Sequence, residues 1–246
     1  MNDPPRRSTL VIVPTFNERD NLPILVPSLM AHPSVRVLVV DDCSPDGTGE
    51  LADELAREHP GRIEVLHRTD RPGLGRSYID GIKKGLREPV DVICQMDADL
   101  SHDPRHLPAL VAAIDRADLV IGSRYVTGGR IVNWPLRRRF LSRFANHYIR
   151  MVTRLNARDC TSGYRCWRRD ALAALSLDRF ISDGYSFLVE MLYVASQQGC
   201  RIAEVPITFV ERRQGESKLS RGVLLESAVT PWRLIATRGA TGSPQR

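Results

Sequence analysis

The sequence lacks the features that mark disulfide-rich, zinc-binding and membrane-spanning proteins. Its five cysteines are scattered, odd in number and without a Cys-x-x-Cys pair, so we expect reduced structural thiols rather than disulfides or a zinc site. No uninterrupted apolar run reaches about 18 residues, the shortest length that suggests a membrane span. Residues 1–8 are polar and contain prolines, without the apolar core of a secretory signal. We therefore expect a protein of a reducing compartment, soluble or peripheral to a membrane.

The glycine-rich loops that commonly bind phosphate are also missing. Gly73-Leu74-Gly75 lacks the third glycine of the dinucleotide fingerprint and does not follow the first predicted strand, and no GxxxxGK sequence occurs. If the protein binds a nucleotide, its phosphates must be held in another way, of which a metal ion is the obvious one.

The composition is that of a globular domain with an excess of positive charge. Of the 246 residues, 42% are hydrophobic and 26% are charged, which suits one α/β domain with a substantial core. The formal net charge of +6 favours an anionic partner such as phosphate, nucleic acid or a membrane surface, without choosing among them.

Short β-branched runs alternate with helical patterns in the first half of the chain. Helices are expected near residues 22–31, 48–59, 75–87 and 104–115, and strands at Thr9–Val13, Val35–Val40, Ile63–His67, Val90–Met96 and Asp118–Gly122. These strand runs are almost continuously apolar, as in strands buried on both faces of a parallel sheet. The rhythm predicts an α/β fold with a doubly wound, mainly parallel central sheet, whose ligands bind beyond the carboxyl ends of the strands.

Acidic residues follow the fourth predicted strand at a spacing that suits a metal. Asp97 and Asp99 stand at positions i and i+2 of an extended chain, so both side chains can face one ligand. A hard cation such as Mg²⁺ or Mn²⁺ would relieve their repulsion and bridge substrate phosphates. The alternative is a solvated acidic turn. Asp103, just before Pro104, is expected to cap a helix instead.

The loop after the second predicted strand is acidic as well. One of Asp41 and Asp42 could reach a nucleotide hydroxyl or base, whereas Asp46 and Thr48 suit turn and cap chemistry. The loop after the first strand, residues 14–18, mixes a turn with polar side chains that suit ribose or base contacts.

Arginines are concentrated after the fifth predicted strand. Arg124 follows that strand directly, and a dense group comes next: Arg137, Arg138, Arg139 and Arg143. The arginine fork matches phosphate geometry, and about two of these residues are expected to bind phosphate. Apolar residues alternate with these arginines along the chain: Trp134, Phe140, Leu141 and Phe144. This mixture suits a surface that contacts both phosphate and lipid. The alternative is a solvated basic face.

Six short motifs fall in the loops of this predicted fold: Pro14–Glu18, Val40–Asp42, Met96–His102, Gly122–Tyr125, Thr161–Arg165 and Gly215–Leu219. Together with Trp134–Asn146 they resemble glycosyltransferase family 2, and within it the dolichol- and polyprenol-phosphate mannose synthases. The resemblance extends from about residue 9 to residue 235. Two positions depart from it: residue 16 is Phe where relatives often have Tyr, and residue 101 is Ser where some have Gln.

The resemblance implies a GT-A fold, GDP-mannose as donor, a polyprenyl (dolichyl-type) phosphate as acceptor, and an inverting transfer. It implies that Asp97 and Asp99 hold Mg²⁺ or Mn²⁺, that Asp99, Arg124 and Arg138 are catalytic, and that Arg124, Arg138 and Ser142 hold the acceptor phosphate. Donor contacts would come from Pro14, Phe16, Glu18, Asp42, Asp97, Arg212 and Lys218. No dedicated general base is expected, because a lipid phosphate is already an anion at neutral pH.

The same resemblance sets the expected organisation and location. Residues 1–8 would be a flexible N-terminus, residues 9–238 one GT-A domain and residues 239–246 a disordered tail. Residues 9–125 would form the nucleotide-binding half and residues 126–238 the acceptor- and membrane-facing half, including a strand at Arg201–Val210 and an amphipathic segment at Leu219–Thr237. We expect a cytoplasmic protein attached peripherally to the cytoplasmic face of a membrane, with an integral-membrane partner protein as an option and no nucleic acid.

Three rival hypotheses stay open at this point. UDP-glucose or another nucleotide-sugar could replace GDP-mannose as the donor. An enzyme of sugar-nucleotide synthesis would normally carry a glycine-rich loop after the first strand, where Pro14-Thr15-Phe16 stands. A nucleic-acid-binding module would explain the basic group but not the acidic strand ends, since carboxylates repel phosphate unless a metal intervenes.

Overall fold

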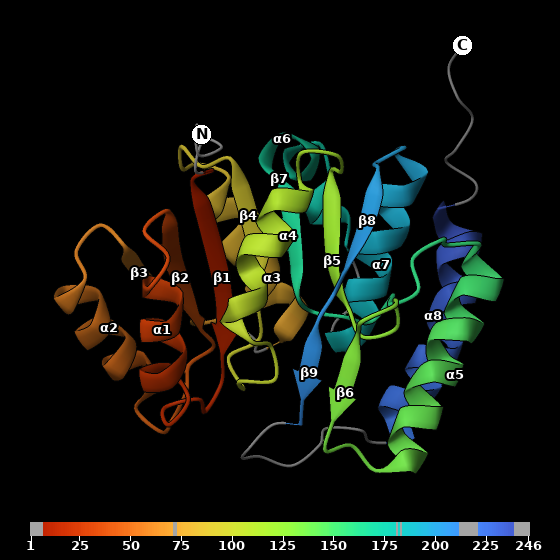
Figure 1. Cartoon of the computed structure of the whole chain (residues 1–246), viewed down its shortest axis with the longest axis horizontal. Coiled ribbons are helices and arrows are strands. Elements are labelled where there is room, and N and C mark those ends of the chain that lie inside the picture. The colour runs from red at the N-terminus through yellow and green to blue at the C-terminus, as the bar shows by residue number, and fades with distance from the viewer. Residues whose placement is uncertain (1–6, 71–72, 181, 183, 212–220, 239–246) are drawn as a thin grey trace.

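A computed structural model describes residues 7–70, 73–180, 182, 184–211 and 221–238. Its centre is a seven-stranded sheet with the order β3-β2-β1-β4-β7-β5-β8 (Figure 1). The strands are β1 (Thr9–Thr15), β2 (Val35–Asp41), β3 (Ile63–His67), β4 (Val92–Gln95), β5 (Leu119–Ser123), β7 (Arg165–Arg168) and β8 (Ile202–Pro206). All neighbours pair in parallel except β7, which is antiparallel to both β4 and β5. The predicted α/β fold with a mainly parallel sheet is confirmed.

Helices cover both faces of the sheet. One face packs against α1 (Leu22–Met30), α2 (Thr48–Glu58) and α4 (Leu107–Ala113), which follows the short helix η1 (Pro104–His106). The other face packs against α3 (Leu74–Gly85), α6 (Arg169–Ala173), η2 (Leu177–Arg179) and α7 (Gly184–Gln197). Two longer helices, α5 (Leu136–Thr153) and α8 (Arg221–Arg238), lie side by side at the β8 end of the sheet (Figure 1).

Strand β1 shows why the strand sequences are apolar throughout. Leu10 and Ile12 join the core on the α3 side, while Val11 and Val13 join the core on the α1 side. Successive side chains of a strand point to opposite faces, so a strand covered on both faces needs an apolar residue at every position.

The predicted strand at residues 201–210 is divided in two. Its first part is β8 in the main sheet, and its second part is β9 (Thr208–Val210), which pairs in parallel with β6 (Arg130–Val132) in a separate two-stranded sheet. Ile207 lies at the break. Sequence analysis did not predict β6 or β7, because both are short and β7 has arginines at its two ends. The predicted segment at 219–237 lies in α8 from residue 221 onward.

The expectation that all cysteines are reduced is wrong for one pair. Cys94 on β4 lies directly opposite Cys166 on β7, with 4.2 Å between their Cα atoms, and the two form a disulfide. Their sequence separation of 72 residues gave no hint of this pairing, which depends on the antiparallel register. Cys43, Cys160 and Cys200 are free, as expected.

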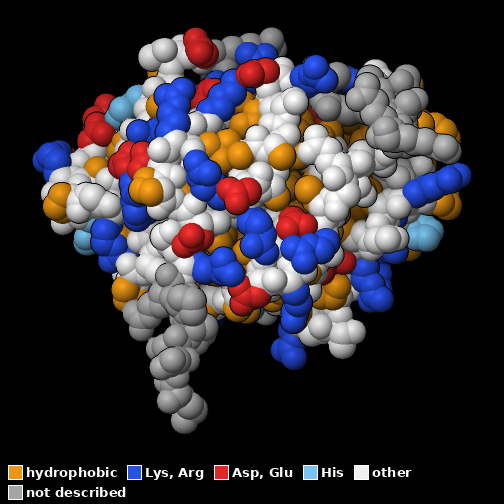
Figure 2. Space-filling view, turned by 90° about the horizontal axis from the view of Figure 1, so that it is seen from above, with side chains coloured by type: hydrophobic (Ala, Val, Ile, Leu, Met, Phe, Trp, Pro, Cys, Tyr) orange, Lys and Arg blue, Asp and Glu red, His pale blue; other side chains and the backbone are white. Residues whose placement is uncertain are grey.

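Balanced charge characterises the end of the molecule where the parallel strands begin. Figure 2 shows basic and acidic side chains interspersed over this end. Arg201 and Arg168 both pair with Asp118, at 2.9 and 3.4 Å, and Arg7 pairs with Asp115. Among the described residues, no helix is both long enough and apolar enough to cross a bilayer.

Trp167 is the largest fully buried side chain of β7, and we predict that the fold depends on it. Its Nε1 donates a hydrogen bond of 2.8 Å to Oε1 of Gln95 on β4. Trp167→Ala should lower the free energy of unfolding by about 3–5 kcal/mol, because it leaves a cavity and an unpaired amide. Met151→Ala, at a side chain that is 67% exposed, should change it by less than about 0.5 kcal/mol. Chemical denaturation measures both values, and equal losses would contradict the prediction.

Candidate active site

The loops that follow β1 and β2 are joined by hydrogen bonds at the carboxyl edge of the sheet. Thr15 donates to Oδ1 of Asp41 at 3.0 Å, and the Ser44 hydroxyl donates to the same oxygen at 2.6 Å. The backbone N–H of Ser44 donates to Oδ2 at 3.1 Å. Asp41 is buried within these contacts, which give it a structural role in shaping the loops.

Asp42, the other member of the pair, is also held in place. It pairs with Arg68, and its Oδ2 accepts a hydrogen bond of 2.8 Å from the backbone N–H of Gly73. Arg68 binds Asp80 as well, at 2.8 Å. Asp42 therefore connects β2 to the start of α3.

The residues predicted for donor contacts after β1 occupy a defined turn. Pro14 is buried, the Phe16 ring is 42% exposed, and Glu18 accepts a hydrogen bond of 2.6 Å from the amide of Asn21. The Glu18 backbone N–H donates to the Thr48 hydroxyl at 3.0 Å. Phe16 is thus the member of this set whose side chain is displayed at the surface.

Two predicted structural roles are confirmed. The Asp46 carboxylate accepts hydrogen bonds from the backbone N–H of Thr48, at 3.0 Å, and from its hydroxyl, at 2.5 Å. Asp103 accepts from the backbone N–H of Arg105 at 2.9 Å and caps η1.

The acidic pair lies just beyond the end of β4. Asp97 and Asp99 are half-buried, Ala98 between them is buried, and the charges of both carboxylates act on the phenol of Tyr78. The phenol of Tyr78 donates to Oδ1 of Asp97 at 2.9 Å, and the backbone N–H of Ser101 donates to Oδ1 of Asp99 at 3.1 Å. Burial and then the charge of Asp97 raise the pKa of Tyr78 well above its usual value, so the phenol stays protonated and keeps donating.

This pair suits a divalent cation that takes its other ligands from a substrate. Mg²⁺ is commonly bound through one or two carboxylates together with substrate phosphates and waters. The described residues contain no cluster of three or more His, Cys, Asp or Glu side chains able to hold a metal by themselves. Beside the pair, the buried hydroxyl of Ser101 has no hydrogen-bond partner among the described residues, and a bound ion or water would satisfy such an atom. The residues therefore fit the expected metal.

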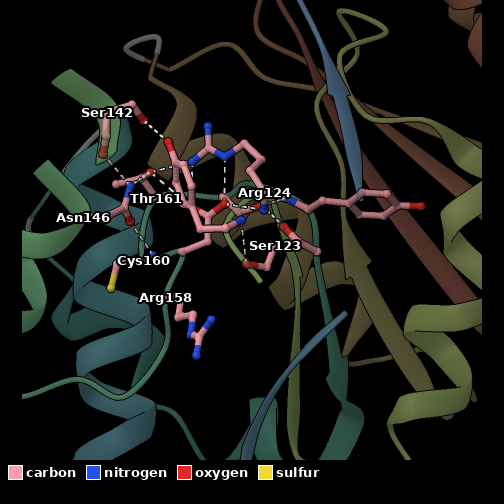
Figure 3. A network of polar contacts seen from close by, with 12 residues as sticks. Ser123, Arg124, Ser142, Asn146, Arg158, Cys160 and Thr161 are labelled. Atoms are coloured by element: carbon pink, nitrogen blue, oxygen red, sulfur yellow. Dashed lines mark hydrogen bonds and ion pairs between the residues drawn. The ribbon is translucent and has the colours of Figure 1, made fainter. Parts of the chain in front are cut away.

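Arg124 is held by a buried carboxylate that sequence analysis missed. Asp159 is fully buried and accepts from Nε of Arg124 at 2.7 Å, from Nη2 at 2.6 Å and from the backbone N–H at 3.0 Å (Figure 3). Nη2 also donates to Thr161 at 2.7 Å. Burial alone would raise the pKa of Asp159, but the charge and hydrogen bonds of Arg124 outweigh it and lower the pKa below 3.8.

Helix α5 joins this network through two side chains. The Tyr125 hydroxyl, next to Arg124, donates to Ser142 at 2.7 Å, and the amide of Asn146 donates to Thr161 at 3.2 Å (Figure 3). Asn146 also accepts from the backbone N–H of Cys160 at 2.7 Å. The structure thus brings the predicted residues Arg124 and Ser142 into one network.

Arg138 reaches the same region through an aromatic ring. Its guanidinium lies 4.1 Å from the Trp134 ring centroid, and the guanidinium of Arg124 lies 5.7 Å from the same centroid. Arg138 also donates to Glu211 at 2.7 Å. Both predicted arginines therefore contact one indole, while the predicted donor contacts Arg212 and Lys218 lie outside the described residues.

One loop connects the acidic pair to the arginines. Thr161 binds Arg124, and two residues later Gly163 lies against Asp97, so close that a methyl group there would be 3.0 Å from Oδ2. The Phe209 ring gives a second connection, since its centroid is 5.5 Å from that of His102 and 5.3 Å from the guanidinium of Arg124. The acidic pair and the arginines therefore belong to one site.

Asp159 escaped prediction for a topological reason. The ligand-binding loops of a parallel sheet follow its strands, whereas residues 159–163 precede β7. Because β7 is antiparallel, its beginning lies at the edge where the parallel strands end. Residues 161–163 belong to a motif of the family resemblance, but without the direction of β7 neither that motif nor Asp159 could be placed beside Arg124.

Replacing Asp159 by Asn should lower the free energy of unfolding by about 3–5 kcal/mol at neutral pH, because the buried guanidinium of Arg124 loses its counter-charge. The folded pKa of Asp159 lies below the unfolded value, so its contribution is complete above about pH 4 and is lost as the pH falls through the folded pKa. Urea unfolding measured from neutral pH down to about pH 3 should show that the difference between wild type and variant narrows as the pH falls below about 4.

The control for this prediction is Asp170→Asn, at a side chain that is 87% exposed. It should change the free energy of unfolding by less than about 0.5 kcal/mol. A difference between wild type and Asp159→Asn that stays constant over the whole pH range would contradict the assigned ion pair.

Comparisons with known proteins identify the family of this chain. The sequence profile of glycosyl transferase family 2 matches residues 10–176. An undecaprenyl-phosphate mannosyltransferase of Micrococcus luteus is 50% identical over 230 residues, which cover 92% of this chain and 94% of the relative. A polyprenol monophosphomannose synthase of Mycolicibacterium smegmatis is 48% identical over 243 residues, covering 96% of this chain and 92% of the relative.

Solved structures share the fold at low sequence identity. Glucosyl-3-phosphoglycerate synthase of Mycobacterium tuberculosis, crystallised with Mn²⁺ and UDP-glucose, has a TM-score of 0.62 and 19% identity over 94% of this chain and 77% of that chain. The mannosyltransferase PcManGT of Pyrobaculum calidifontis, in complex with GDP-Man and Mn²⁺, has a TM-score of 0.57 and 19% identity. The match covers 97% of this chain and 77% of that chain. These likenesses confirm the GT-A fold, and the sequence matches show that the chain belongs to glycosyl transferase family 2.

Proposed function

We propose that this protein transfers mannose from GDP-mannose to a polyprenyl phosphate, with inversion at the anomeric carbon. Two relatives that are about half identical along almost the whole chain are named as mannosyltransferases of polyprenyl-type phosphates, which supports the sugar and the acceptor. GDP as the carrier rests on the resemblance of the site motifs. The same proposal assigns Pro14, Phe16, Glu18 and Asp42 to the donor, with Arg212 and Lys218 closing over it.

The observation that carries the acceptor assignment is a pair of buried donors without partners. Nε1 of Trp134 and Nε of Arg138 are buried, and neither has a hydrogen-bond partner in the described part of the chain. They belong to the two side chains that stack on each other, beside Arg124. A buried N–H that lacks an acceptor costs free energy, and a phosphate oxygen would satisfy it. Arg124, Arg138 and Ser142 are therefore proposed to hold the acceptor phosphate.

The acceptor phosphate acts as the nucleophile in this proposal. Its second pKa is near about 6, by analogy with phosphorylated side chains, so it is an anion at neutral pH and needs no general base. One of its oxygens attacks the anomeric carbon of mannose, and the bond from that carbon to the diphosphate of GDP breaks, with its electron pair leaving on GDP. A Mg²⁺ or Mn²⁺ ion held by Asp97 and Asp99 would supply positive charge for the departing diphosphate.

The chain's own residues orient the two anionic substrates. Asp159 fixes the plane of the Arg124 guanidinium, so the acceptor meets an oriented donor group rather than a mobile side chain. Glu211 does the same for Arg138, and Tyr78 fixes the Asp97 carboxylate. The positive charges of Arg124 and Arg138 reduce the repulsion between acceptor and donor.

A hydrophobic acceptor tail places the reaction at a bilayer. We propose peripheral attachment to the cytoplasmic face of a membrane, with an integral-membrane partner protein as an additional anchor in the same hypothesis. Family membership gives no support to the alternative of a nucleic-acid-binding module.

The function is tested by a donor panel. The protein is incubated with Mg²⁺ or Mn²⁺, a polyprenyl phosphate and one radiolabelled nucleotide-sugar at a time: GDP-mannose, UDP-glucose or UDP-N-acetylglucosamine. Label should enter the organic phase from GDP-mannose, and only when the polyprenyl phosphate is present. Organic-phase label from UDP-glucose and none from GDP-mannose would replace the proposed donor.

The metal role is tested at the acidic pair. Asp99→Asn should lower turnover at least about a hundredfold, because charge stabilisation of the leaving group is worth several kcal/mol. Asp103→Asn is the matched control: it removes a carboxylate only four residues away, yet Asn can still cap η1, so turnover should be close to that of the wild type. Near-normal turnover of the Asp99→Asn variant would contradict the proposed metal site.

A further inference from the structure

An open groove lined by arginines extends from the proposed acceptor site, with which it shares Arg124. It has a volume of about 670 Å³, within the range of ligand pockets, and lies between residues 124–132 and helix α5. Its lining includes Arg124, Arg130, Arg139, Arg143 and Arg158, and no acidic residue. We call this the arginine groove. Arg158 points away from the network around Arg124 (Figure 3).

The outer arginines of the groove differ from the inner arginines of the site. Arg124 pairs with Asp159, and Arg138 pairs with Glu211. The other four arginines of the groove are exposed, and none makes an ion pair with any described residue. Like charges so close together repel one another, and an anionic ligand would relieve this. The groove therefore offers concentrated positive charge to something outside the protein.

An exposed apolar face runs along α5 next to the groove. Leu136, Phe140, Phe144 and Met151 are 80, 74, 58 and 67% exposed, and their spacing places them on one side of the helix. We call these four residues the apolar stripe. Trp232 of the neighbouring helix α8 is 60% exposed and donates to the hydroxyl of Tyr148 on α5 at 2.8 Å, so it extends the stripe sideways.

The stripe and the groove share one helix. Arg139 and Arg143 of the groove follow Leu136 by three and seven residues, so they border the stripe along the length of about two helical turns. Large apolar side chains flanked by arginines are typical of helices that lie in the plane of a membrane interface. A free phosphate or a nucleic acid would satisfy the arginines but leave the stripe in water.

We propose that the arginine groove binds the phosphate headgroup of an anionic bilayer phospholipid while the apolar stripe enters the headgroup region. This phospholipid is a second lipid ligand, distinct from the substrate, so the inference goes beyond the proposed transfer. Bound in this way, the protein presents Arg124 and the acceptor site to the bilayer surface. The composition of the membrane would thus control access to the acceptor.

Vesicle flotation tests this proposal without donor nucleotide or polyprenyl phosphate, so its outcome is independent of transferase activity. Wild type should float with vesicles of phosphatidylcholine and phosphatidylglycerol, less so at high salt, and weakly with phosphatidylcholine alone. Arg143→Gln combined with Arg158→Gln should weaken partitioning to the anionic vesicles about thirtyfold, since each arginine near an anionic surface contributes about fivefold. Phe140→Ser combined with Phe144→Ser should weaken binding to both kinds of vesicle.

The matched control removes the same charge elsewhere. Arg57 on α2 and Arg116 after α4 are exposed and outside the groove, and Arg57→Gln combined with Arg116→Gln should bind anionic vesicles like the wild type. Circular dichroism checks that every variant is folded. Equal losses for the groove and control variants would show that only net charge matters and would overturn the proposal. So would unchanged binding of the groove variant, or equal binding of wild type to neutral and anionic vesicles.

Discussion

The reversed direction of β7 is the constraint on which the site depends. Because this strand is antiparallel to β4 and β5, the loop before it lies at the edge where the other strands end. Arg165 holds that loop from inside: it is fully buried and donates to the backbone carbonyls of Cys160 and Ser162, and to that of Leu188 on α7. Burial lowers the pKa of Arg165 to about 10, so it remains charged at neutral pH. One anchored loop thereby serves both the acidic pair and the arginines.

Charge is organised differently at increasing distance from the centre of the site. Inside, each proposed phosphate-binding arginine has a carboxylate that fixes its orientation, as Asp159 does for Arg124 and Glu211 does for Arg138. At the rim, the other four arginines of the groove, Arg130, Arg139, Arg143 and Arg158, have no such partner among the described residues. Paired inner charges favour defined geometry, whereas unpaired outer charges favour attraction over a longer range. This gradient suits a site that must first gather anionic ligands and then orient them.

Much of the fold was predictable, because apolar strand runs and their spacing follow directly from burial on both faces. The predicted strand at 63–67 agrees with β3, and the other four of the first half agree within a few residues. Asp97 and Asp99 could be assigned to the site because they follow a parallel strand. The roles of Asp46 and Asp103 could be predicted because turns and helix caps depend on neighbouring residues. The break at Ile207, where one predicted strand divides between two sheets, could not be predicted. Which strands pair with one another depends on tertiary contacts. Asp159 and the Cys94–Cys166 disulfide were missed for the same reason: both depend on a strand direction that the residues themselves do not reveal.

The indole of Trp134 is close to two guanidinium groups, with its centroid 5.7 Å from that of Arg124 and 4.1 Å from that of Arg138. A displacement of either arginine therefore changes the surroundings of the ring and, through it, the position of the other arginine. The free-energy changes measured for single substitutions of the two arginines will not add up to that of the double substitution. Each single substitution also shifts the other arginine, so its measured value includes that shift. The two arginines are better described as one unit that shares an aromatic contact than as two independent groups.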